Sequence, residues 1–196
     1  IKSFQKNYSQ ISTDYLILKN LDIIIICLPT PLKSKNKPDL SYLDNCYKNL
    51  SKINIKNKII ILESTVYPGV TRKLANKIVL SDNELEIGKN IFIGYSPERE
   101  NPGDKKFSYN KTPKVISGYS GLCLKLVKSV YKNITNKTFS CNTLEEAETS
   151  KLLENLYRSI NIGLVNEMKI ICDKLDIDVH NVIESAATKN FGFQKF

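Results

Sequence analysis

The residues best suited to chemistry include a lysine and an asparagine in a segment of helical periodicity. Lys151 and Asn155 are four residues apart, so a helix would present both side chains on one face. An ammonium and a carboxamide placed together can stabilise the negative oxygen that develops during a reaction. A solvated helix face carrying ordinary Glu–Lys pairs explains the same residues, and the spacing alone leaves both interpretations open.

Three other polar segments follow short apolar runs, at the points where strands would end. They are Pro29-Thr30-Pro31, Ser64-Thr65 and the charged residues 96–104. In the last of these, the Glu98 carboxylate beside Arg99 could act as a base or position a water molecule. Strand termination, helix capping and a solvated turn are the structural alternatives for the three segments.

Apolar runs alternate with segments of helical spacing, which predicts an α/β fold. Strands are predicted at residues 22–28, 59–65, 91–95, 114–117 and 138–140, and helices at 40–50, 70–79 and 121–131. The first two runs are continuous, so we expect both strands to be buried on two faces. The order favours the C-terminal part of a doubly wound, Rossmann-like parallel sheet. Right-handed crossovers would place all carboxyl ends, and hence the three polar segments, at the ligand-binding edge.

Beyond Thr143 the apolar spacing predicts one long helix that reaches the Asp176 region, followed by a shorter helix at 179–187. At ~1.5 Å per residue the long helix would extend for roughly 40 to 45 Å. Helices of this length usually connect domains or pair with a partner. We therefore expect a sheet-containing domain at residues 1–141 and a central helical domain at 142–196. The first residue, Ile1, and the absence of an evident stop suggest an internal fragment.

The formal charge of +9 raises the question of nucleic-acid binding. The only arginines are Arg72, Arg99 and Arg158, and the lysines are spread through every segment. Nucleic-acid readers favour clustered arginines, so we expect no nucleic-acid partner, although a basic surface would attract a small anion. The longest apolar run, residues 23–28, is far shorter than the roughly 20 residues of a membrane helix, so we also expect a soluble protein without a membrane partner.

The cysteines and the histidine do not form a metal-binding pattern. The five cysteines are Cys27, Cys46, Cys123, Cys141 and Cys172. An odd number without CxxC spacing is typical of reduced thiols in the cytoplasm, and we expect no metal site. The single histidine, His180, is interpreted as a surface or helix-start residue, because it lies in a polar stretch after Asp176 and Asp178.

Taken together, the motifs resemble the UDP-glucose/GDP-mannose dehydrogenase family. The segments that carry the resemblance are DIIIICLPTPL (22–32), ESTVYPGVT (63–71), YSPERENPGD (95–104), PKVISGYS (113–120) and residues 146–193. They cover nearly the whole chain in order. The YPGVT and SPERENPGD forms are similar to those of the UDP-N-acetylglucosamine 6-dehydrogenase branch.

The resemblance implies an NAD-dependent oxidoreductase that oxidises C6 of a UDP-sugar twice, from alcohol to carboxylate, for polysaccharide precursor synthesis. It implies that the NAD site is lined by Pro29, Thr30, Ser64 and Thr65. Thr65 would also lie near a catalytic water, and Glu98 would assist that water or the acid–base steps. The residues implied at the substrate are Glu98, Arg99, Lys151 and Asn155. Lys151 and Asn155 would stabilise the oxyanion, and the long helix would form a homodimer.

The sequence departs from the family pattern in three respects. It lacks the GxGxxG phosphate loop, a nucleophilic cysteine in a Gly-Gly-x-Cys context, and the second, UDP-binding domain. The fragment by itself is therefore expected to be inactive. Two alternatives remain: a non-catalytic fragment that only mediates dimerisation, and a different substrate such as UDP-glucose, UDP-N-acetylgalactosamine or UDP-N-acetylmannosamine.

Overall fold

The computed structural model describes residues 11–99 and 112–195, which belong to two compact units. The first unit ends at Lys151 and the second begins at Leu152. The strands, in their order across one sheet, are β1 (Ile23–Ile26), β2 (Lys58–Leu62), β3 (Ile91–Tyr95), β4 (Lys114–Gly118) and β5 (Thr138–Ser140). The helices are α2 (Ser41–Leu50), α3 (Val70–Ser81), α4 (Gly121–Lys132), α5 (Leu144–Lys174) and α6 (Val179–Ala187), with 3-10 turns η1 (Tyr15–Asn20) and η2 (Ser34–Asn36).

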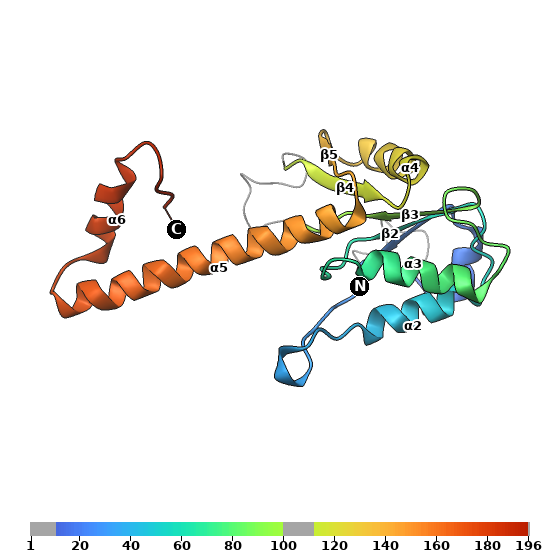
Figure 1. Ribbon diagram of the computed structural model, residues 1–196, viewed down its shortest axis with the longest axis horizontal. Coiled ribbons are helices and arrows are strands. Elements are labelled where there is room, and N and C mark those ends of the chain that lie inside the picture. The colour runs from blue at the N-terminus through green and yellow to red at the C-terminus, as the bar shows by residue number, and fades with distance from the viewer. Residues whose placement is uncertain (1–10, 100–111, 196) are drawn as a thin grey trace. The chain divides into compact units, whose positions relative to one another are not determined.

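Helices cover both faces of the sheet (Figure 1), which confirms the α/β fold. Side chains alternate between the two faces of a strand, and β2 shows how this builds two cores. Ile60 and Leu62 pack with residues of α2 and α3 in one apolar cluster. Ile61 packs with residues of α4 in the other. β2 is therefore buried on both faces, as its continuous apolar run predicts.

The direction of β4 corrects the expectation that all carboxyl ends lie at one edge. β1, β2 and β3 are parallel, but β4 is antiparallel to β3, with Tyr95 opposite Ser117, and β5 is parallel to β4. A parallel neighbour would need a crossover, usually a helix, between β3 and β4. The connecting residues 96–113 contain three prolines, Pro97, Pro102 and Pro113, and no helical spacing. The amino end of β4 consequently lies beside the carboxyl end of β3.

β1 is buried on one face only, which corrects the prediction for residues 22–28. Ile24 and Ile26 belong to the core, whereas Ile23 and Ile25 are 40% and 41% exposed. The reason is that the cluster containing α4 reaches β2 and β4 but includes no residue of β1. Within the described part of the chain, β1 pairs only with β2 and forms an edge of the sheet.

The boundary between the two units falls within the long helix α5, after Lys151. Its first turns belong to the first unit, where Leu144 and Ala147 are fully buried in the core with the sheet. In the second unit, the Asp178 carboxylate caps α6 by accepting a hydrogen bond from the His180 main-chain N at 2.8 Å. His180 is therefore an exposed helix-start residue, as expected. Among the described residues, no helix combines the length and apolar character that crossing a membrane requires.

The close packing of α4 on β4 generates a prediction about Gly118. A Cβ at this position would lie 2.1 Å from the Leu124 N and 2.6 Å from its Cα. Because the backbone of α4 would have to shift to relieve this clash, Gly118→Ala should lower the free energy of unfolding by about 2 kcal/mol. Gly121→Ala is the matched control, since nothing lies within 4 Å of its Cβ. Urea-induced unfolding measures both, and equal stabilities for the two variants would contradict the packing described.

Candidate functional site

The loops that follow β1 and β2 are joined by two hydrogen bonds. The Thr30 Oγ1 donates to the Thr65 main-chain O at 2.7 Å. The buried Ser64 Oγ accepts from the Leu28 main-chain N at 2.9 Å. The alternative in which the Ser64 and Thr65 hydroxyls cap the next helix is not what the structure shows, because the main-chain N atoms of Gly69 and Thr71, at the start of α3, donate to the Glu148 carboxylate. Thr30 and Ser64 therefore hold two strand ends together.

A buried lysine at the amino end of β4 lies between two carboxylates. The Lys114 side chain is 5% exposed, and its Nζ lies 3.1 Å from the Glu63 Oε1 and 3.7 Å from the Glu98 Oε2. The Tyr131 hydroxyl of α4 donates to Glu63, and its ring centroid lies 5.4 Å from the Lys114 Nζ. Sequence reasoning missed Lys114, Glu63 and Tyr131, because only the antiparallel direction of β4 brings Lys114 to this edge.

The segment after β3 contacts the long helix through Lys151. The Lys151 Nζ donates a hydrogen bond to the Glu98 main-chain O. Arg99 is held in turn by its own loop, since its Nη1 donates to the Pro113 O at 3.0 Å and its main-chain N donates to the Glu98 Oε1 at 2.7 Å. Lys151 therefore contacts the loop after β3, whereas the solvated alternative predicted a surface Glu–Lys pair. The remainder of the charged segment, residues 100–104, lies outside the described residues.

The predicted site residues are thus distributed over two units. Thr30, Ser64, Thr65, Glu98 and Lys151 belong to the first unit, where the contacts above connect them. Pro29 is an exposed residue three positions beyond the end of β1. Asn155 belongs to the second unit, where its Oδ1 accepts a hydrogen bond from the Arg158 Nη2 at 2.8 Å. The roles assigned to all of them stay predictions.

The thiols of the chain are poorly suited to nucleophilic chemistry. All five cysteines are free, and Cys46, Cys123, Cys141 and Cys172 are buried. The exposed one, Cys27, lies 3.7 Å from the Glu63 Oε2 through its Sγ. Partial burial, and then the Glu63 carboxylate, raise the pKa of the Cys27 thiol. Because the thiolate is the nucleophile, a raised pKa disfavours the reactive form of Cys27.

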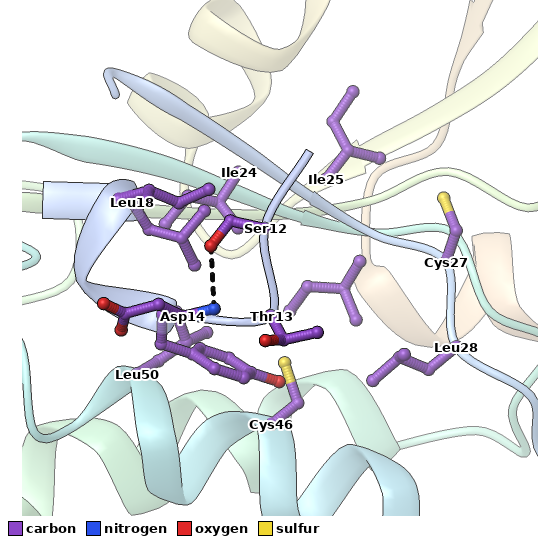
Figure 2. Close-up of a pocket in the computed structure, with 13 residues that line it drawn as sticks. Ser12, Thr13, Asp14, Leu18, Ile24, Ile25, Cys27, Leu28, Cys46 and Leu50 are labelled. Carbon is purple, nitrogen blue, oxygen red and sulfur yellow. Dashed lines mark hydrogen bonds between the residues drawn. The ribbon is translucent and has the colours of Figure 1, made fainter. Parts of the chain in front are cut away.

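A pocket of about 300 Å³ lies beside β1, between η1 and α2. Figure 2 shows its lining, which is mainly apolar and includes Leu18, Ile24 and Leu50. Cys27 and Leu28 bring it close to the end of β1, but none of the predicted site residues lines it. The candidate site is therefore the set of polar contacts at the strand ends, and this apolar pocket is separate from it.

The arrangement offers a dinucleotide two partly exposed loops at the carboxyl ends of parallel strands. Thr30 and Thr65 are each half-buried, and the Thr30 hydroxyl, whose proton is given to the Thr65 O, retains acceptor capacity. Such strand ends are where dinucleotides bind in doubly wound sheets. These residues therefore fit one part of an NAD site, without the glycine-rich phosphate loop.

Fold and site together define a Rossmann-like dinucleotide-binding unit followed by a long helix. Comparison with protein families gives this class a specific identity. Residues 2–135 match the NAD binding domain of the UDP-glucose/GDP-mannose dehydrogenase family, and residues 145–196 match the central domain of the same family. The chain belongs to this family, and the prediction of NAD as the cofactor is confirmed at that level.

Individual relatives give the same result. The chain is 41% identical over 173 residues to Protein CapL of Staphylococcus aureus, covering 88% of this chain and 41% of the relative. It is 37% identical over 173 residues to the UDP-N-acetyl-D-glucosamine 6-dehydrogenase of Pseudomonas aeruginosa, with the same coverage. The solved UDP-D-ManNAc dehydrogenase of Pyrococcus horikoshii superposes with a TM-score of 0.84 at 31% identity, over 92% of this chain and 43% of that chain. The chain thus spans about two fifths of the length of these relatives.

The buried position of Lys114 generates a prediction about stability. Lys114→Met should lower the free energy of unfolding by about 3–5 kcal/mol, because it leaves the Glu63 carboxylate without its cation. Glu63 is itself largely buried, with a side-chain exposure of 12%. Adding Glu63→Gln removes that charge while keeping an acceptor for Tyr131, so the double variant should regain at least half of the loss. Urea-induced unfolding compares the three proteins, and a double variant less stable than Lys114→Met would contradict the ion pair.

Proposed function

We propose that this chain forms the NAD-binding and central parts of a UDP-N-acetylglucosamine 6-dehydrogenase. The observation that carries the proposal is the contact of Lys151 with the Glu98 segment at the strand ends, in a chain whose first 135 residues match an NAD-binding domain. The choice of N-acetylglucosamine is supported by the YPGVT and SPERENPGD forms and by the 37% identity to a relative with that name. Five relatives named as UDP-N-acetyl-D-mannosamine dehydrogenases are 30–33% identical to the chain.

The proposed reaction converts the C6 alcohol of the sugar to a carboxylate in two oxidations. One alcohol, two NAD⁺ and one water give one carboxylate, two NADH and three protons. When bound, NAD accepts the hydride that leaves the carbon being oxidised. Hydride leaves readily only when the adjacent oxygen is deprotonated, so each oxidation requires a base for the proton and a fixed positive charge for the oxyanion.

The residues of this chain divide these tasks. The Lys151 ammonium supplies the positive charge beside the oxyanion, and Asn155 donates a further hydrogen bond to it. Glu98 assists the attacking water or takes the proton, and Thr65 positions that water. Pro29, Thr30, Ser64 and Thr65 line one part of the NAD site, and Arg99 contacts the substrate. The proposal assigns the nucleophile to none of the thiols of this chain, since a raised pKa disfavours the thiolate of the exposed Cys27 and the other four cysteines are buried.

The proposal predicts a stoichiometry that can be measured directly. The complete protein, meaning a polypeptide of family length that contains this chain, should form two NADH for each UDP-N-acetylglucosamine consumed. Absorbance at the NADH band and analysis of the sugar product give both quantities. Its kcat/KM should be higher for UDP-N-acetylglucosamine than for UDP-N-acetylmannosamine or UDP-glucose. A reversed preference would overturn the choice of sugar. A folded protein that forms no NADH from any of the three sugars would overturn the proposal that it is a dehydrogenase.

A variant of Lys151 is the active-site control for this experiment. Lys151→Ala should lower kcat by at least about a hundredfold, because it removes the charge that stabilises the oxyanion. Lys169→Ala is a matched control on the same helix, since Lys169 is exposed and pairs with Asp173 at the i,i+4 spacing. Near-normal turnover of the Lys151 variant would contradict the role assigned to it.

We also propose that α5 pairs with a second copy of the chain. The supporting observation is a stripe of exposed apolar residues at helical spacing in the second unit, namely Leu153, Leu156, Ile160, Leu164 and Ile171. Contiguous exposed apolar surface of this kind marks an interaction site.

The pairing predicts that charge on this stripe separates the copies. Ile160→Lys combined with Leu164→Lys should halve the molecular mass of the complete protein in sedimentation, because two buried cations would face the partner helix. Asn166→Lys adds charge on another face of α5 and should leave the mass unchanged. A wild-type protein that sediments as a monomer would refute the proposal.

A further inference from the structure

The carboxylate of Glu148 is fully buried near the beginning of α5. It is the one acidic residue in the buried class among the described residues, and in that part of the chain no lysine or arginine forms an ion pair with it. Its three hydrogen bonds all come from the amino end of α3. The Oε2 accepts from the Gly69 main-chain N at 2.6 Å, and the Oε1 accepts from the Thr71 main-chain N at 2.8 Å and from the Thr71 Oγ1 at 2.6 Å. Backbone donors and one hydroxyl thus compensate this buried charge.

The amino end of α3 needs an acceptor from elsewhere in the chain. Its N-cap is Gly69, which has no side chain and adopts a left-handed conformation with φ of 92°. The first main-chain N–H groups of a helix have no partner within the helix, and they carry partial positive charge. The Glu148 carboxylate fills the role that a serine or aspartate has in an ordinary cap. Because the capping residue lies on α5 and the capped end belongs to α3, the interaction holds the two helices together.

Both partners of the contact between Glu148 and the start of α3 lie close in sequence to predicted site residues. Lys151 lies three residues after Glu148, on the next turn of the same helix. Thr65 lies four residues before Gly69, in the loop that Thr30 holds at its other end. The depth and rotation of the first turns of α5 determine where Lys151 leaves the helix. We propose that Glu148 is a positioning residue that places the Lys151 ammonium relative to the Ser64-Thr65 loop; this inference rests on the proposed function.

The variant Glu148→Gln tests the hydrogen bonds between Glu148 and the start of α3. In Glu148→Gln, the amide group replaces one carboxylate oxygen, and it would direct its own N–H groups at Gly69 or at Thr71. One set of donors therefore loses its acceptor although the side-chain volume is unchanged. Thr71→Val is a milder second variant, since it removes only the hydroxyl donor and keeps the shape.

Glu145 provides the matched control. It lies one turn earlier on α5 and also binds α3, through two hydrogen bonds to Arg72 at 2.6 and 3.1 Å. Its side chain is 35% exposed, however, and the pair is a surface contact. Glu145→Gln removes the charge and one acceptor oxygen of this α5–α3 contact without leaving buried donors unsatisfied.

The experiment is a double-mutant cycle in the complete protein. Glu148→Gln should lower kcat about tenfold or more in the presence of Lys151, and less than about twofold in a Lys151→Ala background, because a positioning residue acts only through the group that it positions. Thr71→Val should show the same pattern with a loss of about two- to fivefold, and Glu145→Gln should stay within about twofold of the wild type. A loss by the same factor in both backgrounds, or no loss, would overturn the inference.

Hydrogen exchange supplies a readout that does not depend on turnover. Mass spectrometry should show faster exchange in peptides that contain residues 69–74 for Glu148→Gln than for Glu145→Gln. Unchanged exchange would refute the connection itself, even if the enzyme assay fails. A folded wild type that forms no NADH overturns the proposed function, and with it the claim that Glu148 positions Lys151 for catalysis. An active wild type beside an equally active Glu148→Gln variant overturns this inference alone.

Discussion

The buried ammonium of Lys114 is the interaction on which the candidate site depends. Removing a charge from water costs several kcal/mol, and the cost is offset only if carboxylates lie close by. Glu63, directly after β2, and Glu98, in the loop after β3, meet this requirement at 3.1 and 3.7 Å. Because one cation needs both partners, the ends of β2 and β3 and the start of β4 are held as a single edge. Tyr131 extends the contact to α4.

A second buried charge performs the corresponding task for the helices. The carboxylate of Glu148 is compensated by the amino end of α3, so the start of α5 is fixed against the loop that carries Thr65. The two charges differ in how they are stabilised. Lys114 depends on oppositely charged side chains, whereas Glu148 depends on main-chain donors and the helix dipole. Rigid elements thus place Glu98 and Lys151, which themselves lie at half-buried positions.

Local sequence patterns predicted most elements because their causes are local. β3 at 91–95, β5 at 138–140 and α6 at 179–187 have the predicted bounds, since short apolar segments and helical apolar spacing are visible in the local sequence. The exposed face of β1 was not predictable in this way. Residues 22–28 and 59–65 show the same continuous apolar run, and only the reach of α4 over the sheet distinguishes them. The resemblance of motifs identified the family correctly, because the motifs are contiguous stretches of sequence.

The sequence by itself determined the α/β class, the polar residues at the strand ends and the shared helical face of Lys151 and Asn155. These features depend on neighbours within a few residues. Only the tertiary structure decided that β4 reverses direction, that Lys114 lies between Glu63 and Glu98, and that Glu148 caps a helix 77 residues away. The physical reason is that these contacts join residues far apart in the chain. Strand pairing and helix docking bring such residues together, and the local periodicity of the sequence does not predict which residues will meet.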